Sequence, residues 1–337
     1  MNSTPARREP SINDVARAAG VSAQTVSRVA TGKDVVRAET RERVIEAMQE
    51  LGYRPNGAAR ALKSGRFRNI GVIMFSLSTY GNMRTLEAIA SEATTAGYSL
   101  TLIPLDAATQ SSVSGAFARL SEQAVDGIII LIEAHRLNES DVELPTGMPV
   151  VVLDSSAHYD LPVVDTDQAQ GARLATEHLL GLGHETVWHV TGPQESFSAQ
   201  RRQDSWRRTL TDHGAAVPEP LTGDWTAESG HAAGVRLAAM PGVTAVFAAN
   251  DQMALGVLRA LHQAGRGVPG DVSVVGFDDM PEAASFWPAL TTVRQHFDQV
   301  GVAAWRSLLA TIEGERPGPV GLIPTELVVR ESSGLAR

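Results

Sequence analysis

The chain of 337 residues contains no cysteine. Disulfide scaffolds, thiol nucleophiles, iron–sulfur clusters and cysteine-type zinc sites are therefore excluded. It also lacks any apolar run of about 18 residues, the length that a membrane-spanning helix needs. Residues 1–10 are polar and do not contain the apolar core of a secretory signal. We therefore expect a cytoplasmic protein that has no membrane partner.

Charge is present but unevenly distributed. Residues 1–68 hold 13 Lys and Arg against 7 Asp and Glu, which gives a net charge of +6. The remainder carries −15, so the overall charge of −9 conceals a basic head on an acidic body. A basic head favours binding to a polyanion, although a solvated basic helix face would give the same count.

The basic head has the pattern of two short helices joined by a turn. Ser11 is a good N-cap for a helix that Gly20 ends, and Ser22 can cap a second helix over 23–30. Gln24 and Arg28 would lie on the exposed face of the second helix, where they could bond the adenine and guanine edges in the major groove. A third helix is predicted over 38–51. A small helical domain that binds no DNA is the alternative.

The run from Ile12 to Val29 resembles the headpiece of the LacI/GalR family of bacterial repressors, as do residues 40–44 and 51–56. The chain departs from the family at Arg37, where a Ser usually opens the third helix. Arg37 cannot cap a helix as Ser does, but it could contact a phosphate. The resemblance implies that the following residues contact DNA: Ser11, Ser22, Ala23, Gln24, Thr25, Ser27, Arg28, Asn56, Ala59 and Leu62.

Residues 56–62 resemble the hinge helix of the family, which forms when two subunits pair on an operator. The resemblance implies that Leu62 wedges into the minor groove and bends the duplex. Gly57 weakens a helix by about 1 kcal/mol, so we expect the hinge to be less helical without DNA. An ordinary flexible linker with one exposed leucine is the alternative.

From residue 69 onward, apolar strands alternate with helices. Alternating units of this kind predict an α/β fold with parallel sheets that are buried on both faces. The two halves, about 70–165 and 166–295, each resemble one doubly wound unit. The predicted strands lie at 70–74, 98–103, 127–132, 149–154, 186–190, 245–248 and 272–276.

Ligands of such sheets bind beyond the carboxyl ends of the strands. Polar and aromatic residues follow the predicted strands or lie between them: Phe75, Asp154, Arg202, Trp225, Asn250 and Asp278. Carboxylates, an amide and an arginine suit sugar hydroxyls, and an aromatic ring suits the apolar sugar face. Acids at strand–helix junctions are also common helix N-caps, and we interpret Asp251 and Asp279 as caps.

The resemblance to the family covers essentially the whole chain. It continues in His178–His184, Asn250–Gly256, Val274–Asp279 and Leu290–Gln295. It implies a headpiece over 1–55, a hinge over 56–68, and a two-lobed body over 69–337 similar to periplasmic sugar-binding proteins. The implied N-lobe spans about 69–165 and 296–324, and the C-lobe about 166–295 and 325–337.

The resemblance also assigns roles within the cleft between the lobes. It implies that Arg202, Asn250 and Asp278 hydrogen-bond sugar hydroxyls and that Trp225 stacks on the ring. Asp154 and Gln295 would line the cleft, and Phe75 would form its N-terminal wall. His178 and His184 are interpreted as structural, so we expect no metal and no cofactor.

The function implied is a DNA-binding repressor of carbohydrate-utilisation genes. A glycoside or disaccharide in the cleft would release it from a pseudo-palindromic operator on the nucleoid. The leucine heptads that make some members tetrameric do not follow residues 327–330, so we expect a homodimer. The residues of the wall at 75–82 and Thr166 differ from those of a sugar-responsive member, so the sequence does not identify the sugar.

Two alternatives to this function remain. A purine-type corepressor would reverse the sign of the response, and DNA affinity that rises with ligand would indicate it. A glycoside hydrolase would use Asp154 and Asp278 as its paired carboxylates. Because the chain has no catalytic signature and carries a helix-turn-helix head, we do not expect an enzyme.

Overall fold

The computed structural model describes residues 10–30, 35–54, 65–74, 77, 79–105, 110–131, 147–153, 162–316 and 321–337. The chain forms two compact units, and the boundary between them lies between Phe67 and Arg68. We call them the N-terminal unit and the body. Within the described residues, no helix is both long enough and apolar enough to cross a membrane.

The N-terminal unit contains three helices: α1 (Ile12–Ala19), α2 (Ala23–Ala30) and α3 (Ala38–Leu51). Their facing sides bury Val15, Val26 and Val44 completely. On each helix a second buried residue follows at helical spacing (Ala19 after Val15, Val29 after Val26, Ala47 after Val44). Each helix therefore presents one apolar stripe to the other two and leaves its polar side to solvent.

Local capping fixes where these helices begin and end. The Asp14 carboxylate accepts hydrogen bonds from the Ser11 backbone N–H (2.9 Å) and hydroxyl (2.6 Å). Ser22 Oγ accepts from the Thr25 N–H at 3.1 Å, so Ser22 caps α2 as the sequence predicts. Gly20 adopts a left-handed φ of 64° at the turn. Arg37 precedes α3 without a side-chain cap bond, as expected.

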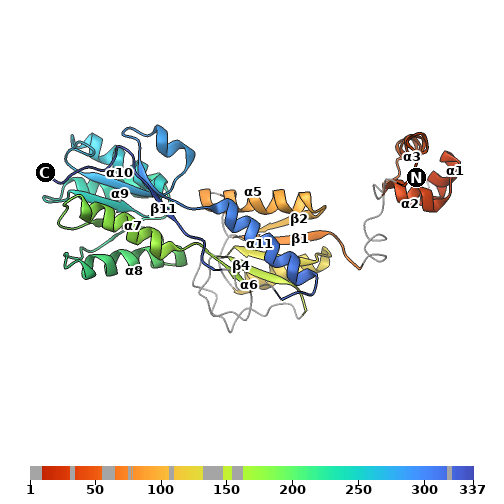
Figure 1. Ribbon diagram of the computed structural model, residues 1–337, viewed down its shortest axis with the longest axis horizontal. Coiled ribbons are helices and arrows are strands. Elements are labelled where there is room, and N and C mark those ends of the chain that lie inside the picture. The colour runs from red at the N-terminus through yellow and green to blue at the C-terminus, as the bar shows by residue number, and fades with distance from the viewer. Residues whose placement is uncertain are drawn as a thin grey trace, which may run out of the picture. The chain divides into compact units, whose positions relative to one another are not determined.

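The body consists of two lobes, each built on one sheet (Figure 1). The sheet of the N-lobe is entirely parallel. Helices α5 (Tyr80–Thr95) and α11 (Phe297–Ile312) cover one face, and α6 (Gln110–Glu122) covers the other. In sheet order the strands are β2 (Ser99–Pro104), β1 (Asn69–Met74), β3 (Gly127–Leu131), β4 (Val150–Leu153) and β5 (Val163–Val164).

The C-lobe repeats this plan with one additional strand. Helices α7 (Gln168–Gly181) and α8 (Phe197–Asp212) cover one face, and α9 (Ala227–Ala238) and α10 (Asp251–Gln263) cover the other. Only the last strand runs antiparallel to its neighbour. In sheet order the strands are β11 (Glu326–Val328), β10 (Thr291–Arg294), β9 (Ser273–Asp278), β8 (Ala245–Ala248), β6 (Trp188–Thr191) and β7 (Leu221–Thr222).

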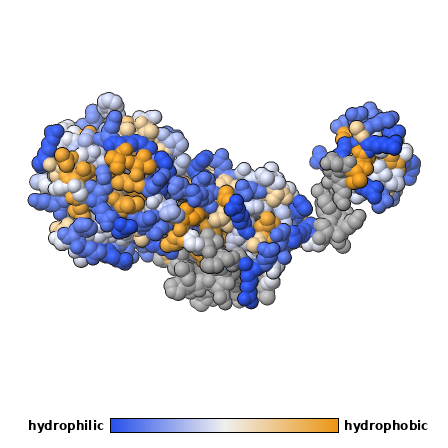
Figure 2. Space-filling model, in the orientation of Figure 1, coloured by the Kyte–Doolittle hydropathy of each residue, from blue (hydrophilic) through white to orange (hydrophobic). Residues whose placement is uncertain are grey.

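The two sheets of the body and the three helices of the N-terminal unit confirm the predicted fold class: a helix-turn-helix headpiece followed in the chain by an α/β body of parallel sheets. Strands β1, β3, β4 and β8 are buried almost end to end, as continuous apolar runs covered on both faces require. In the view of Figure 2 the surface is largely hydrophilic, with apolar patches over the C-lobe.

The chain passes between the lobes three times, at 165–167, 295–296 and 321–325. Two of these crossovers pair as extended backbone: the Asp167 N–H donates to the Ile323 carbonyl (2.8 Å), and the Ile323 N–H donates to the Asp165 carbonyl (2.9 Å). The crossovers bring the carboxyl end of the N-lobe sheet toward that of the C-lobe sheet. Residues from both ends therefore meet between the lobes.

Candidate functional site

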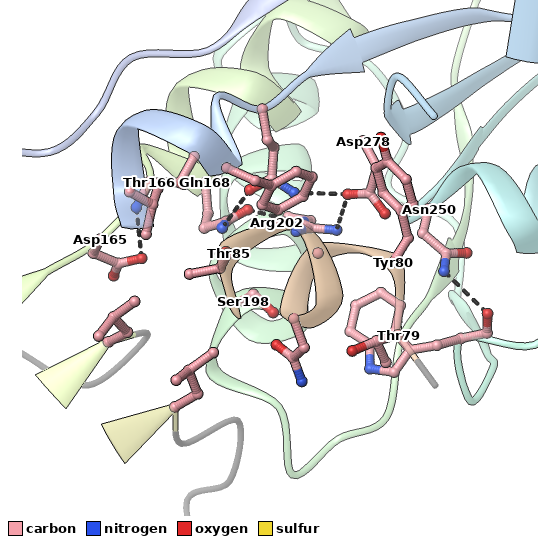
Figure 3. A pocket seen from close by; sticks show the side chains of 18 of the residues that line it. Thr79, Tyr80, Thr85, Asp165, Thr166, Gln168, Ser198, Arg202, Asn250 and Asp278 are labelled. Carbon is pink, nitrogen blue, oxygen red and sulfur yellow. Dashed lines mark hydrogen bonds and ion pairs between the residues drawn. The ribbon is translucent and has the colours of Figure 1, made fainter. Parts of the chain in front are cut away.

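A cleft lies between the lobes at the carboxyl ends of their strands, where doubly wound sheets bind ligands (Figure 3). Its empty volume is about 710 Å³, including the part that is open to solvent. The C-lobe contributes Ser198, Arg202, Trp225, Asn250 and Asp278 to its lining. The N-lobe side comes from the first turns of α5 and α11 and the ends of β3, β4 and β5.

Five of the residues predicted to bind the effector lie in this cleft: Arg202, Trp225, Asn250, Asp278 and Gln295. They come from five different segments of the chain, and the fold alone brings them together. Phe75 and Asp154 lie outside the described residues. The ligand contacts assigned to all seven residues stay predictions.

Arg202 lies deep in the cleft, with only 4% of its surface exposed. Its Nε donates to Gln168 Oε1 at 2.8 Å, and its NH1 donates to the Ala249 carbonyl. The guanidinium centre lies 3.9 Å from the centroid of the Phe277 ring. A buried cation is costly unless it is paired and hydrogen-bonded, and these contacts offset that cost.

Asp278 is the carboxylate partner of this cation. Its Oδ1 lies 3.9 Å from Arg202 NH1 and accepts a hydrogen bond from Gln295 Nε2 at 2.7 Å. Gln295 Oε1 in turn accepts from Gln168 Nε2 at 3.0 Å. Arg202, Gln168, Gln295 and Asp278 therefore form a closed ring, which we call the cleft ring.

Asn250 has a structural role in addition to the predicted one. Its Oδ1 accepts from the Met253 N–H (2.8 Å) and so caps α10, and its Nδ2 donates to the Trp225 carbonyl (3.0 Å). The amide that was predicted to meet the ligand thus also fixes the backbone of the predicted stacking residue.

Trp225 and Asp278 both have positive φ values, 73° and 114°, which are uncommon for residues other than glycine. Backbone strain of this kind persists only where the surrounding structure enforces it, and it occurs often at functional sites. The Trp225 indole packs directly over Gly192, where an added Cβ would lie 2.3 Å from the ring. The indole therefore has a fixed position on the cleft wall.

The interpretation of Asp251 and Asp279 as helix N-caps is wrong. Asn250 caps α10, and Asp251 is its first helical residue. Asp251 is fully buried and accepts from the Met280 N–H (2.9 Å) and the Thr292 hydroxyl (2.5 Å). Burial, together with the nearby Asp278, raises the pKa of the Asp251 carboxyl well above its usual range.

Asp279 forms an ion-pair cluster instead of a cap. Its two oxygens lie 2.6 Å from Arg294 Nε and 2.6 Å from Arg330 NH2. The two cations come from β10 and from the segment after β11. Asp279 therefore ties the strand that leads to the cleft to the C-terminal segment of the chain.

Only part of the N-lobe wall was predicted: Tyr80 and Asn82 lie in the expected wall at 75–82, whereas Thr85 and Phe297 were not predicted. Tyr80, Asn82 and Thr85 from the first turns of α5 line the cleft, and Phe297 of α11 meets Tyr80 edge to face at 5.7 Å. Burial raises the pKa of the Tyr80 hydroxyl, and Asp278 is among the acids that raise it further. The signal that could have found this wall is that α5 follows β1, the strand at the point where the strand order reverses.

Asp165 and Gln168 were not predicted as lining residues, because they lie in the first crossover and directly after it. Asp165 is buried, accepts from the Thr166 N–H at 2.7 Å and pairs with Arg201. Burial raises the pKa of its carboxyl, although Arg201 opposes that shift. Thr166, noted as a departure from the family, lies in the cleft lining.

The histidines of the family motif have structural roles. His178 Nε2 lies 2.9 Å from Ser333 Oγ, and His184 contacts Thr244, Ser273 and the Gly334 carbonyl at 3.0–3.2 Å. Both therefore attach the C-terminal segment to the C-lobe. In the described part of the chain, no group of three or more His, Cys, Asp and Glu side chains could hold a metal ion.

In the N-terminal unit, Gln24 and Arg28 of α2 and the preceding Ser22 are exposed. Ser11, Ala23, Thr25 and Ser27 are partly exposed. The predicted recognition surface therefore lies on the outside of the three-helix core. The predicted hinge residues Asn56, Ala59 and Leu62 lie outside the described residues.

Comparison with known proteins identifies the family to which the chain is similar. Residues 11–56 match the model of bacterial regulatory proteins of the lacI family, and residues 176–333 match the periplasmic binding protein-like domain. The chain is 35% identical over 324 residues to the lactose operon repressor of Escherichia coli, covering 95% of this chain and 89% of that protein. It is 33% identical to the HTH-type transcriptional repressor PurR of Vibrio campbellii, covering 95% of this chain and 98% of that protein.

Solved structures agree with these matches. The lac repressor dimer bound to operator and the anti-inducer ONPF superimposes with a TM-score of 0.87 at 35% identity, covering 98% of this chain and all of that one. The CelR–cellobiose complex superimposes with a TM-score of 0.71 at 32% identity, covering 96% and 99%. The chain belongs to the lacI family of bacterial regulatory proteins. It is a transcriptional repressor of that family and not an enzyme.

Proposed function

We propose that this protein represses carbohydrate-utilisation genes in the cytoplasm and leaves its operator when an uncharged glycoside or disaccharide binds in the cleft. The observation that carries the proposal is the set of five cleft residues. A cation, a carboxylate and two amides lie beside one indole, the combination that sugar hydroxyls and an apolar sugar face require. Relatives whose structures hold the anti-inducer ONPF and cellobiose support it.

The charges in the cleft favour an uncharged ligand. Among the described lining residues Arg202 is the only basic side chain, whereas Asp165 and Asp278 are acidic. Arg202 already lies 3.9 Å from the Asp278 carboxylate and within the cleft ring. A sugar phosphate would have to compete with Asp278 for the same cation, so its binding would cost more than that of a neutral sugar.

The N-terminal unit would read the operator through α2. Gln24 and Arg28 have the side chains that bond adenine and guanine in the major groove, and both are exposed. Two copies of the chain would place two such helices on the half-sites of a pseudo-palindrome. The lac repressor structure described above is a dimer on its operator, which supports a homodimer here.

One titration of the wild type and of Trp225 variants tests both the class of ligand and the position of its binding site. The purified protein is titrated in a thermal-shift assay with lactose, cellobiose, maltose, ribose, glucose 6-phosphate and hypoxanthine. Ligand that binds the native state raises the melting temperature by mass action. We expect a neutral saccharide to give the largest rise, Trp225→Ala to weaken its binding about tenfold or more, and Trp225→Phe to retain most of it.

Other outcomes of this titration are equally decisive. A rise in melting temperature with hypoxanthine alone would favour corepression by a purine. A rise with glucose 6-phosphate alone would contradict the argument from charge. Unchanged saccharide binding by Trp225→Ala would remove the indole from the site.

A further inference from the structure

We infer that Gln168 is a positioning residue of the cleft, which holds Arg202 and Asp278 at the spacing that the ligand requires. This inference rests on the proposed function, because it concerns the same cleft. Gln168 is 5% exposed and is the first residue of α7, directly after the first crossover (Figure 3). No motif in the sequence marks it.

Both ends of the Gln168 amide are engaged with other members of the cleft ring. Its Oε1 accepts from Arg202 Nε at 2.8 Å, and its Nε2 donates to Gln295 Oε1 at 3.0 Å. An amide can accept and donate at the same time, whereas an ionised carboxylate cannot donate and an ammonium cannot accept. Gln168 therefore fixes the orientation of the guanidinium on one side and of the next amide on the other.

The second amide continues the arrangement to the acid. With its Oε1 bound to Gln168, Gln295 must turn its Nε2 toward Asp278, to whose Oδ1 it donates at 2.7 Å. Arg202 NH1 and Asp278 Oδ1 lie 3.9 Å apart, farther than a hydrogen bond. Each charged group is thus anchored from the side by a glutamine, and this anchoring sets the distance between them.

The same turn of α7 makes a second, comparable contact outside the cleft. Gln170 Oε1 accepts from the backbone N–H of Thr325 at 2.7 Å and from its hydroxyl at 3.1 Å. Gln168 therefore joins α7 to the second crossover, and Gln170 joins it to the third. Only Gln168 contacts a charged residue of the cleft, so Gln170 is a matched control.

The test compares Gln168→Leu with Gln170→Leu in the full-length protein. Leucine keeps a similar volume and removes the amide. We expect both variants to lower the melting temperature by similar amounts and to bind DNA normally without ligand. The saccharide that stabilises the wild type most, taken from lactose, cellobiose, maltose and ribose, should bind Gln168→Leu about 10- to 100-fold more weakly. Its Kd for Gln170→Leu should stay within about twofold of the wild type.

Gln168→Glu tests the two hydrogen bonds of Gln168, to Arg202 and to Gln295, separately. The carboxylate still accepts from Arg202 Nε but cannot donate to Gln295. We expect it to restore part of the affinity that Gln168→Leu loses, because the guanidinium keeps its anchor. A role confined to the stability of the fold would not produce this order of affinities.

Two results would overturn the inference. One is an equal loss of saccharide affinity in the two leucine variants. The other is an Arg202 side chain that stays against the Phe277 ring in the unliganded crystal structure of Gln168→Leu. We expect Arg202 to leave that ring in Gln168→Leu and to keep its contact in Gln170→Leu. If no saccharide stabilises the wild type, the proposed function fails, and these crystal structures still decide the positioning role: an Arg202 that has not moved would contradict it.

Discussion

At the scale of a single residue, Arg202 is both buried in the fold and charged in the cleft. It is almost fully buried, yet it carries the only positive charge among the described residues of the cleft lining. Its contacts with Gln168, the Ala249 carbonyl and the Phe277 ring show how that charge is tolerated. A substitution here changes the stability of the fold as well as the chemistry of the cleft.

Arg202→Ala should therefore have two effects. We expect loss of the saccharide response, and also a decrease of about 2–4 kcal/mol in the free energy of unfolding, because the truncation leaves Asp278 and the Ala249 carbonyl without this partner. Denaturant unfolding and thermal-shift titration measure the two effects separately. Wild-type stability in this variant would show that the buried contacts of Arg202 contribute little.

His189 provides a residue-scale prediction about pH. It is completely buried, and its ring centroid lies 4.6 Å from that of Phe247. Its Nδ1–H donates a hydrogen bond to the Phe247 carbonyl (2.8 Å). Burial lowers the pKa of the imidazole from 6.5 to about 4. Above pH about 6.5 neither the folded nor the unfolded chain protonates it. Between 6.5 and 4 only the unfolded chain does, so stability falls as the pH is lowered.

The expected contribution of His189 is about 3 kcal/mol of lost stability at pH 4 relative to pH 7. Urea unfolding across this range should show a smaller loss for His189→Phe than for the wild type. His231→Phe, which removes an imidazole bonded to Gln263, serves as the control for replacing a histidine by phenylalanine. Equal slopes in all three proteins would mean that His189 is not neutral in the folded state.

At the scale of elements, α5 and α11 are packed together more closely than side chains normally allow. An added Cβ at Gly301 of α11 would lie 2.5 Å from Ala88 Cβ and 2.8 Å from the Thr85 carbonyl of α5. Both helices begin at the cleft, with Tyr80 and Phe297 in contact. Gly301 therefore fixes how the two helices of the N-lobe wall lie against each other.

Gly301→Ala should destabilise the body by about 1–3 kcal/mol, although alanine favours a helix by about 1 kcal/mol. Gly115→Ala in α6 is the matched control, because an added Cβ there meets nothing within 4 Å. We expect that substitution to leave stability unchanged or raise it slightly. Chemical denaturation of the two variants measures the difference, and a stabilised Gly301→Ala would show that the helix pair can separate without cost.

The elements themselves were largely predictable from the sequence, because each depends on residues close together in the chain. The strand ends that carry Asn250 and Asp278 follow from continuous apolar runs, and the turn of the N-terminal unit follows from Gly20 and Ser22. The partners of Asp279 did not follow, since Arg330 lies 51 residues away in sequence. Gln168 was missed for the same reason, as its bond to Gln295 spans 127 residues.

At the scale of the whole molecule, the proposed dimer needs a contact surface on the body. Trp287 has 93% of its surface exposed, an unusual state for the largest apolar side chain. We expect Trp287→Ser to weaken self-association in sedimentation velocity. Val217→Ser, at an apolar position that is 40% exposed, should not. A wild type that is monomeric at micromolar concentration would contradict the dimer, and an unaffected Trp287→Ser would place the contact elsewhere.

The central claim joins the two units: saccharide in the cleft weakens the hold of the N-terminal unit on DNA. The most direct test measures the Kd for a duplex that the full-length protein selects from a random pool, with and without the saccharide that stabilises it most. We predict that saccharide raises this Kd at least about tenfold and that the duplex raises the Kd for saccharide by the same factor, as linkage requires. An unchanged DNA affinity would contradict the account, and an affinity that rises with saccharide would show corepression instead of induction.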